Sequence, residues 1–344
     1  MNDRAEVRKR PTQADVARLA SVSQPVVSYV LNADSCASVA AGTRQRVLDA
    51  IATLGYVPHH TARSLRRRRT FTISSAIPDI TNPYYPAFER GIQDAAEREG
   101  YDLITYNTDG SLEKERKFLQ SALAGRVDGV IVRFFQATLQ ECLQLVAAGI
   151  AVVALTSEPP PAGNLPIDTT AIDGAAAAQT AVSFLIARGH QRIGMLAGEA
   201  GSRARARRTL GYSEALRAQG LPFDTMLVRG SRFTEAGGYA ATEELLALAA
   251  RPTAIFAADD LLAFGAMAAL RDADLRIPED VALIGFDDIP AARLVCPPLT
   301  TIAQHPERLG ARAAELLLER LAGGGPPEGR HVEMPFDLIV RQSA

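Results

Sequence analysis

Residues 12–32 read TQADVARLASVSQPVVSYVLN. This stretch predicts two short helices joined by a tight turn. Thr12 precedes the first apolar-periodic run and Asp15 follows three residues later, so their side chains can satisfy free backbone N–H groups at the start of the first helix. The apolar residues of this helix share one face: Val16, Leu19 and Ala20.

The second predicted helix begins after a turn at Ser21 and Val22. Ser23 can cap this helix, and Pro25 lies in its first turn, where a missing N–H costs little. Its apolar residues are Val26, Val27, Val30 and Leu31. By periodicity, Val27 and Val30 are predicted to lie in the core.

A third helix is predicted to follow Thr43 and to end at Gly55, because glycine readily adopts the left-handed conformation of a helix end. Its apolar residues recur at helical spacing: Val47, Ile51 and Leu54. Three short helices in about 50 residues, the second of them polar at its start, form the helix-turn-helix pattern of DNA-binding proteins.

The charge of the chain is unevenly distributed. The net charge is −2, but residues 1–70 hold 12 Lys and Arg against 5 Asp and Glu, so the remainder is acidic. A basic head on an acidic body indicates that the head meets a polyanion. The three scattered cysteines predict neither a disulfide framework nor a thiolate metal site. With no signal-peptide pattern and no long apolar run, we expect a cytoplasmic protein without a membrane partner.

From residue 71 onwards, short apolar runs alternate with helical patterns. The first series of predicted strands is 71–77, 101–106, 128–133 and 150–155, and the second is 192–196, 225–230, 253–257 and 281–286. Buried strands that alternate with helices predict parallel sheets covered by helices on both faces. Two such series, joined near 156–172, predict two doubly wound lobes with a cleft between them. A last strand is predicted within 336–342.

Longer motifs make a family resemblance specific. The pattern TxxDVAxxAxVSxxxVSxVLN, followed by TRxxVLxAIxxLGYVP, resembles the N-terminal signature of the LacI/GalR family of bacterial transcription regulators. Four further motifs resemble that family's effector-binding domain, in the family's order: RGHQRIGMLAG (188–198), RPTAIFAADDLLAFGAM (251–267), IPEDVALIGFDD (277–288) and PPLTTI (297–302). The resemblance therefore covers nearly the whole chain.

The resemblance implies a small all-α helix-turn-helix (lambda-repressor-like) head and a two-lobed α/β periplasmic-binding-protein-like (type I) effector domain, with three crossings between the lobes. The implied boundaries are a DNA-binding domain at 1–58, a hinge helix or linker at 59–70, and an effector-binding and dimerisation domain at 71–344. The N-lobe is expected at about 71–170 and 303–332, and the C-lobe at about 171–302 and 333–344.

The start of the second helix is expected to read DNA. By the resemblance, Gln24, Pro25 and Tyr29 contact base edges in the major groove, where an amide can bond an adenine bidentately and a proline offers an apolar surface. Phosphate contacts are expected from Ser23, Ser28 and Asn32. The alternative for Gln24 and Tyr29 is surface exposure without a DNA contact.

The connector HHTARSLRRRR (59–69) is too short for a stable isolated helix in water. In the family this segment forms a hinge helix that pairs with its dimer mate in the minor groove. The resemblance assigns DNA contacts to Ala62, Arg63 and Leu65, with the leucine as an apolar wedge. His59 and His60 are expected to be polar hinge residues and not metal ligands.

The effector cleft is expected beyond the carboxyl ends of the strands, between the lobes. By the resemblance, seven residues match effector-contact positions of the family: Tyr84, Tyr85, Arg133, Arg208, Phe233, Asp259 and Asp287. Carboxylates that accept hydroxyl hydrogen bonds, an arginine fork and aromatic faces are groups that bind a polyol. No cofactor is implied.

One departure from the family bears on the effector. Arg133 stands where the family usually has an uncharged residue, and Arg133 with Arg208 favours an anionic effector, such as a sugar acid or a sugar phosphate, over a neutral sugar. The alternative is that Arg203, Arg205 and Arg207 are solvated helix-start residues and that Arg133 pairs with a protein carboxylate.

The function that these features favour is that of a transcription regulator, foremost a repressor, which binds a palindromic operator as a homodimer under the control of a small-molecule effector. The expected partners are double-stranded operator DNA, a sugar, sugar acid or sugar phosphate, and a second copy of the chain. A solute-binding transport protein would share the lobes, but the basic head opposes it. An enzyme is disfavoured because the chain shows no G-x-S-x-G elbow, phosphate-binding glycine loop or metal-ligand spacing.

Overall fold

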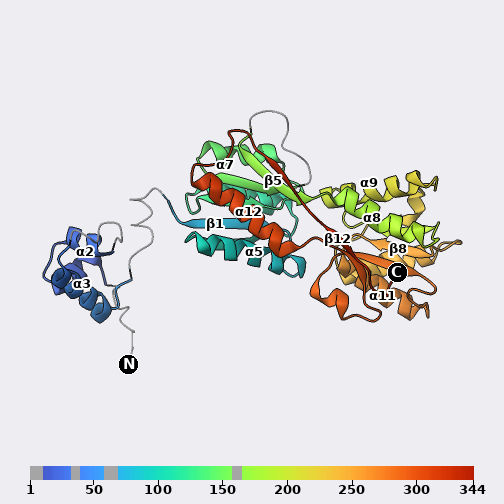
Figure 1. The fold of residues 1–344 in the computed structure, drawn as a ribbon, viewed down its shortest axis with the longest axis horizontal. Helices are drawn as coiled ribbons and strands as arrows, with labels where there is room; N and C mark the ends of the chain where they lie inside the picture. Colours follow the sequence, from blue (N-terminus) through green and yellow to red (C-terminus); the bar gives the residue numbers. More distant parts are fainter. Residues whose placement is uncertain (1–10, 32–38, 58–68, 157–164) are drawn as a thin grey trace, which may run out of the picture. The chain divides into compact units, whose positions relative to one another are not determined.

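The computed structural model describes residues 11–31, 39–57, 69–156 and 165–344. The chain divides into two compact units, Met1–Thr70 and Phe71–Ala344, and each is described by itself. Figure 1 shows helices alone in the described part of the first unit and sheets with helices in the second. None of the helices in the described segments is long and apolar enough to cross a membrane.

The first unit contains the three predicted helices: α1 (Gln13–Leu19), α2 (Gln24–Leu31) and α3 (Ala41–Leu54). The predicted cap of α1 is confirmed, because Thr12 Oγ1 accepts from the backbone N–H of Asp15 and the Asp15 carboxylate accepts from the backbone N–H of Thr12. The predicted end of α3 is also confirmed, since Gly55 has a φ of 60°.

The small core of this unit forms where the apolar faces of the helices meet. Val27 and Val30 are buried, as predicted, and pack with Val16 and Val47. Two predictions were wrong. Leu19 is 51% exposed, because it faces away from the contacts with α2 and α3. The third helix begins at Ala41, not after Thr43, because the carbonyl of Ala40 already accepts from the N–H of Arg44.

The second unit holds two six-stranded sheets. The first sheet has the order β11-β5-β4-β3-β1-β2, and every pairing in it is parallel. Its strands are β1 (Thr72–Ile77), β2 (Asp102–Asn107), β3 (Gly129–Val132), β4 (Ala151–Leu155), β5 (Ile167–Ile172) and β11 (His331–Met334). The helices of this lobe are α5 (Tyr84–Arg98), α6 (Leu112–Leu123), α7 (Leu143–Ala147) and α12 (Pro306–Leu321), with the 3₁₀ turn η2 (Leu139–Cys142).

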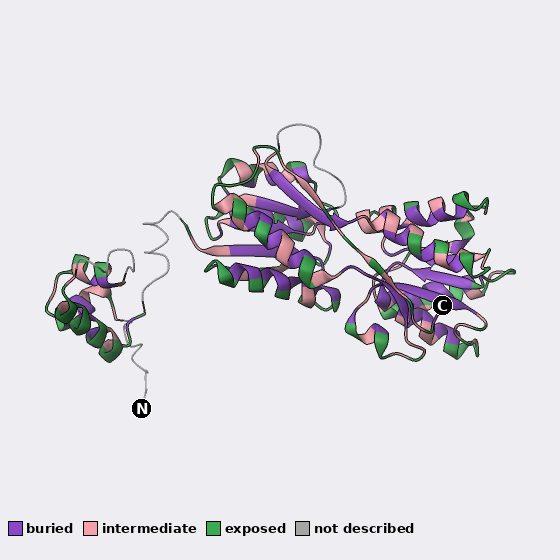
Figure 2. Ribbon diagram, in the orientation of Figure 1, coloured by how far each residue is buried: buried purple, intermediate pink, exposed green. Residues whose placement is uncertain are grey.

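The second sheet has the order β12-β10-β9-β8-β6-β7, and only β12 runs antiparallel to its neighbour. Its strands are β6 (Ile193–Leu196), β7 (Val228–Arg229), β8 (Ala254–Ala257), β9 (Ala282–Asp287), β10 (Thr300–Ala303) and β12 (Asp337–Ile339). The helices around it are α8 (Gly174–Ala187), α9 (Arg203–Ala218), α10 (Glu235–Leu246) and α11 (Asp260–Asp272), with the 3₁₀ turns η3 (Thr225–Leu227) and η4 (Pro290–Arg293). Figure 2 shows that the central strands of both sheets are buried.

The predicted two-lobed α/β class and its three crossings between lobes are confirmed. The chain crosses after β5, between β10 and α12, and between β11 and β12. The strand predicted at 225–230 is mostly wrong, because Asp224 accepts from the N–H of Met226 and starts a 3₁₀ turn there. In the first sheet, β5 continues to Ile172 and β11 to Met334, slightly beyond the lobe limits expected at 170 and 332.

The helices α5 and α12 pack on the same side of the first sheet with their backbones in close contact (Figure 1). A Cβ atom added to Gly91 of α5 would lie 2.0 Å from the carbonyl oxygen of Glu307. The reciprocal contact is as tight, since a Cβ at Gly310 of α12 would lie 2.0 Å from the carbonyl oxygen of Phe88. Two glycines therefore set the spacing of this helix pair.

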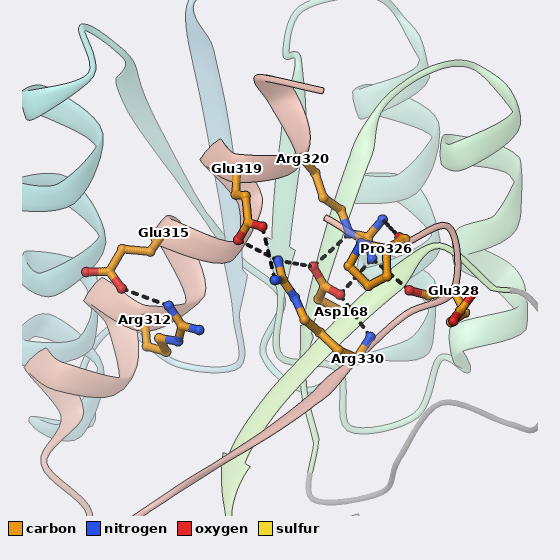
Figure 3. Close-up of polar contacts among 8 residues, drawn as sticks. All are labelled: Asp168, Arg312, Glu315, Glu319, Arg320, Pro326, Glu328 and Arg330. Atoms are coloured by element: carbon orange, nitrogen blue, oxygen red, sulfur yellow. Dashed lines mark hydrogen bonds and ion pairs between the residues drawn. The ribbon is translucent and has the colours of Figure 1, made fainter. Parts of the chain in front are cut away.

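A buried carboxylate ties the end of α12 to the first sheet (Figure 3). Asp168 of β5 is fully buried and accepts two hydrogen bonds from Arg320, from Nε and Nη2, each at 2.7 Å. It also accepts from the backbone N–H of Arg330 at 3.0 Å, and the side chain of Arg330 pairs with Glu319 at 2.8 Å. These contacts hold α12, β5 and the segment before β11 together.

Candidate effector cavity and DNA-reading helix

A cavity of about 180 Å³ lies between the two lobes, where the carboxyl ends of strands in both sheets meet. All seven residues predicted for the effector site line it: Tyr84, Tyr85, Arg133, Arg208, Phe233, Asp259 and Asp287. The first three belong to the first lobe and the other four to the second. The fold thus gathers side chains that are up to 203 positions apart in the sequence, as ligand sites of open α/β sheets require.

Two carboxylates form the acidic side of the cavity. Asp259 caps α11 by accepting from the N–H of Leu262 at 2.7 Å, and Asn82 of the first lobe lies 3.5 Å from its other oxygen. Asp287 ends β9 with a φ of 119° and accepts a hydrogen bond from the amide of Gln304. Burial raises the pKa of both carboxyl groups, and the negative charge of Asp287 raises that of Asp259 further.

Arg208 is neutralised within the protein. Its side chain is buried, donates to the carbonyl of Ala258, and has Nη2 3.9 Å from Oδ1 of Asp287. The guanidinium also lies over the ring of Phe286, with Cζ 3.8 Å from the ring centroid, which is cation–π geometry. Arg208 therefore fixes the position of Asp287 and balances its charge.

Arg133 has a different environment. Its Nη1 donates to the carbonyl of Leu155 at 2.9 Å, and no carboxylate of the described segments forms an ion pair with it. The alternative that Arg133 pairs with a protein carboxylate therefore has no support among those segments. Beside it, Tyr84 and Tyr85 are buried with their rings edge to face, 5.2 Å apart. Burial raises the pKa of Tyr85 to about 12, so its hydroxyl stays protonated at neutral pH.

Aromatic side chains from both lobes meet at the cavity. Phe135 of the first lobe and Phe233 of the second have ring centroids 6.4 Å apart. The ring of Phe233 rests against Gly198, where an added Cβ would lie 2.1 Å from Cζ and where φ is +79°. A side chain at position 198 would displace this ring.

Several lining residues were not among the predicted site residues: Asn82, Phe135, Thr156, Arg203, Gln304. Gln304 lies two residues after the PPLTTI motif and directly follows β10, so its place at the end of a strand of the second sheet could have identified it. Arg203, which is expected from the sequence to be a solvated helix-start residue, lines the cavity. Arg207 pairs with Asp173 at 2.8 Å and Arg205 donates to the carbonyl of Gly198, so neither is simply solvated.

The start of α2 presents its predicted DNA-reading residues to solvent. Ser23, Gln24 and Pro25 are exposed, and Tyr29 is 43% exposed. Ser28 is half-buried. The remaining predicted DNA contacts, Asn32, Ala62, Arg63 and Leu65, lie outside the described residues, as do His59 and His60. Within the described ranges, no group of three or more His, Cys, Asp or Glu residues could hold a metal ion.

A helix-turn-helix unit with an exposed polar helix start, followed by a two-lobed unit with a polar cavity, defines the class of DNA-binding transcription regulators. A family model described as "Bacterial regulatory proteins, lacI family" matches residues 12–59. A second model, described as "Periplasmic binding protein-like domain", matches residues 182–344. The chain belongs to the lacI family of bacterial regulatory proteins, whose members are regulators and not enzymes.

Similar proteins match along almost the whole chain. The HTH-type transcriptional repressor PurR of Pasteurella multocida (strain Pm70) is 35% identical over 334 residues, which cover 96% of this chain and 98% of that protein. A solved complex of the transcriptional regulator CelR with cellobiose is 32% identical, with a TM-score of 0.72, and the match covers 97% of this chain and 100% of that one. The Lac repressor dimer bound to operator and the anti-inducer ONPF is 26% identical, with a TM-score of 0.85, over 97% and 99% of the two chains.

Proposed function

We propose that this protein is a transcriptional repressor that binds a palindromic operator as a homodimer and whose operator affinity is set by a small molecule in the cavity between its lobes. The observation that carries the proposal is the gathering of all seven predicted effector residues around one cavity, on a chain that begins with a helix-turn-helix unit. The solved Lac repressor dimer bound to operator supports the same assembly.

In the DNA complex, α2 lies in the major groove. Gln24 bonds a base edge, Pro25 contacts an apolar base edge such as a thymine methyl, and Tyr29 reads a third position through its hydroxyl or its ring. Ser23, Ser28 and Asn32 contact phosphates. In the hinge segment, Ala62, Arg63 and Leu65 contact the minor groove of the operator centre. A homodimer presents two such units, so its operator is two-fold symmetric.

The effector is a polyhydroxylated molecule of the sugar class. Asp259 and Asp287 accept hydrogen bonds from its hydroxyls, and Tyr84, Tyr85 and Phe233 supply ring faces and hydroxyls. The CelR–cellobiose complex supports a carbohydrate ligand for this fold. Of the two arginines that favour an anionic effector, Arg208 is balanced by Asp287, so this preference rests on Arg133.

Effector binding changes the fit between the lobes and thereby the operator affinity, with a coupling of about 1–3 kcal/mol for a typical allosteric regulator. Selection of binding sites from random duplex DNA by the full-length protein, at about physiological salt, tests the first half of the proposal. Enrichment of a palindrome supports a dimeric operator reader. A folded sample that enriches only non-symmetric or random sequences, with and without candidate sugars, contradicts it.

A further inference from the structure

The arginines around the cavity fall into two groups. Arg207 pairs with Asp173 at 2.8 Å, Arg208 lies 3.9 Å from Asp287, and Arg232 lies 3.6 Å from Glu199; these three are balanced by carboxylates. Arg133 and Arg203 also line the cavity but form no ion pair with any residue of the described segments. The two uncompensated cations therefore belong to the cavity itself.

The acidic residues of the lining do not supply the missing countercharge. Asp79 accepts from the backbone and the hydroxyl of Thr81, and Asp109 pairs with Lys114. Glu199 faces Arg232. Asp259 caps a helix, and Asp287 lies 3.9 Å from Arg208; the charge of Arg133 lowers the pKa of Asp287, but the two side chains form no ion pair. Two guanidinium groups in a partly enclosed space attract an anion more strongly than they would in open solvent, because screening by water is reduced there.

The two arginines come from opposite lobes. Arg133 directly follows β3 of the first lobe, and its contact with the carbonyl of Leu155 fixes one end of its guanidinium. Arg203 is the first residue of α9 in the second lobe. Its charge nevertheless acts on the thiol of Cys142 in the first lobe: burial raises the pKa of this thiol to about 12, and Arg203 is the cation that opposes the rise. Arg203 also lines the cavity together with Gly110 and Phe135 of the first lobe, so it lies at the boundary between the lobes.

We propose that Arg133 and Arg203 form an anion subsite that binds the carboxylate or phosphate of the effector, while Asp259 and Asp287 accept hydrogen bonds from its hydroxyls. The proposal rests on the proposed function and narrows the effector to an anionic polyol, such as a sugar acid or a sugar phosphate. Guanidinium forks match the geometry of both anions. Since each lobe contributes one arginine, a bound anion links the lobes directly.

The test measures ligand binding to the full-length protein by thermal shift and calorimetry, with matched neutral and anionic compounds at constant ionic strength. The panel contains glucose, gluconate and glucose 6-phosphate, the corresponding galactose and fructose derivatives, and inorganic phosphate and sulfate. The variants are Arg133→Gln and Arg203→Gln. Arg217→Gln is the control, because it removes one positive charge from the exposed end of the same helix α9, where Arg217 is 80% exposed.

We expect an anionic member of the panel to bind more tightly than its neutral counterpart. Each of the substitutions Arg133→Gln and Arg203→Gln should lower the affinity for that anionic compound by about tenfold or more, because a hydrogen bond to a charged group is lost. Arg203→Gln should change the affinity of neutral sugars by less than about threefold, and Arg217→Gln should preserve the anion preference.

Three results would overturn the anion subsite. One is binding of neutral sugars with equal or greater affinity, and another is an anion preference that survives Arg203→Gln. The third result has two parts. No sugar derivative binds, and replacing chloride by phosphate or sulfate raises the Tm of the wild type no more than that of the Arg133→Gln/Arg203→Gln double variant. If neutral sugars bind and change operator affinity, the anion subsite fails and the proposed function stands. If a compound binds in the cavity without any change in operator affinity, the proposed function fails.

Discussion

Replacement of Arg320 by Met tests the ion cluster at the end of α12. Arg320 donates twice to the fully buried Asp168 and also lies 3.3 Å from the carbonyl oxygens of Pro326 and Glu328. Methionine keeps most of the apolar stem, so the variant removes the charge and the hydrogen bonds while leaving little empty space. Asp168 then retains only Arg330, whose Nη2 is 3.3 Å away.

The magnitude follows from the burial of the carboxylate. Removal of one partner of a buried ion pair costs about 3–5 kcal/mol, because the other charge is left uncompensated. Arg330 stays in place and reduces the loss, so we expect the free energy of unfolding to fall by about 2–4 kcal/mol. For a domain of this size, each kcal/mol lowers the Tm by about 2–4 °C, which gives a decrease of about 4–16 °C.

The same helix offers a matched control. Arg312 pairs with Glu315 at 3.1 Å across one turn of α12, and the two side chains are 36% and 50% exposed (Figure 3). Arg312→Met should cost less than about 1 kcal/mol, as expected for an exposed pair. Thermal and urea unfolding of both variants measure the difference. Equal losses from Arg312→Met and Arg320→Met would refute the reasoning that burial of Asp168 makes its pair strong.

The cluster also predicts a pH dependence. Burial raises the pKa of Asp168, but the hydrogen bonds from Arg320 and from the backbone N–H of Arg330, together with the charges of both arginines, outweigh burial and hold the pKa below its ordinary value. A carboxylate with a lowered folded-state pKa contributes stability above its unfolded pKa of about 3.9 and loses it as the pH falls through the folded value. The difference between wild type and Arg320→Met should therefore shrink below about pH 4.

Three further predictions follow from the packing, the cavity and the DNA-reading helix. Gly91→Ala should destabilise the second unit by about 1–3 kcal/mol in urea unfolding, because its Cβ would meet the carbonyl of Glu307. Gly174→Ala in α8 of the same unit should not, because its Cβ would meet no atom closer than 3.7 Å; equal effects would contradict the tight spacing of α5 and α12. Burial raises the pKa of Asp259, so its contribution to the free energy of unfolding is present below about pH 4 and is lost as the pH rises. Asp259→Asn should therefore flatten the decline of the free energy of unfolding between about pH 5 and 8, and an unchanged decline in this variant would contradict the raised pKa of Asp259. Gln24→Ala should weaken operator binding by about 1–3 kcal/mol in fluorescence anisotropy and relax selectivity at one base pair, and unchanged selectivity would show that Gln24 reads no base.

Local signals explain which elements could be predicted from the sequence. Thr12 and Asp15 cap α1 with each other, and Gly55 ends α3, because capping depends on residues within one turn. The strands β5 and β10 were not predicted as strands, because their threonines interrupt the apolar runs. Four threonines of these strands are nevertheless fully buried, and the hydroxyl of each takes part in a hydrogen bond: Thr169, Thr170, Thr300 and Thr301.

For the cavity, too, some features could be predicted from the sequence and others could not. The family resemblance predicted seven residues that all line the cavity, and Asp259 and Asp287 among them lie within the quoted motifs. The sequence could not predict how the charges are balanced. The partners of Arg208 are Ala258 and Asp287, which are 50 and 79 positions away and meet it only in the folded lobe. The separation of balanced from unbalanced arginines therefore required the structure.

The most direct test of an effector-controlled repressor is the operator affinity of the full-length protein with and without a compound that binds the cavity. The operator comes from the selection experiment, and the compound is one whose binding is weakened by substitution of Asp287. Saturating compound should change the dissociation constant for the operator by about 5–150-fold, and saturating operator should change the affinity for the compound by the same factor. A compound that binds at Asp287 and leaves operator affinity unchanged would contradict the coupling between cavity and DNA.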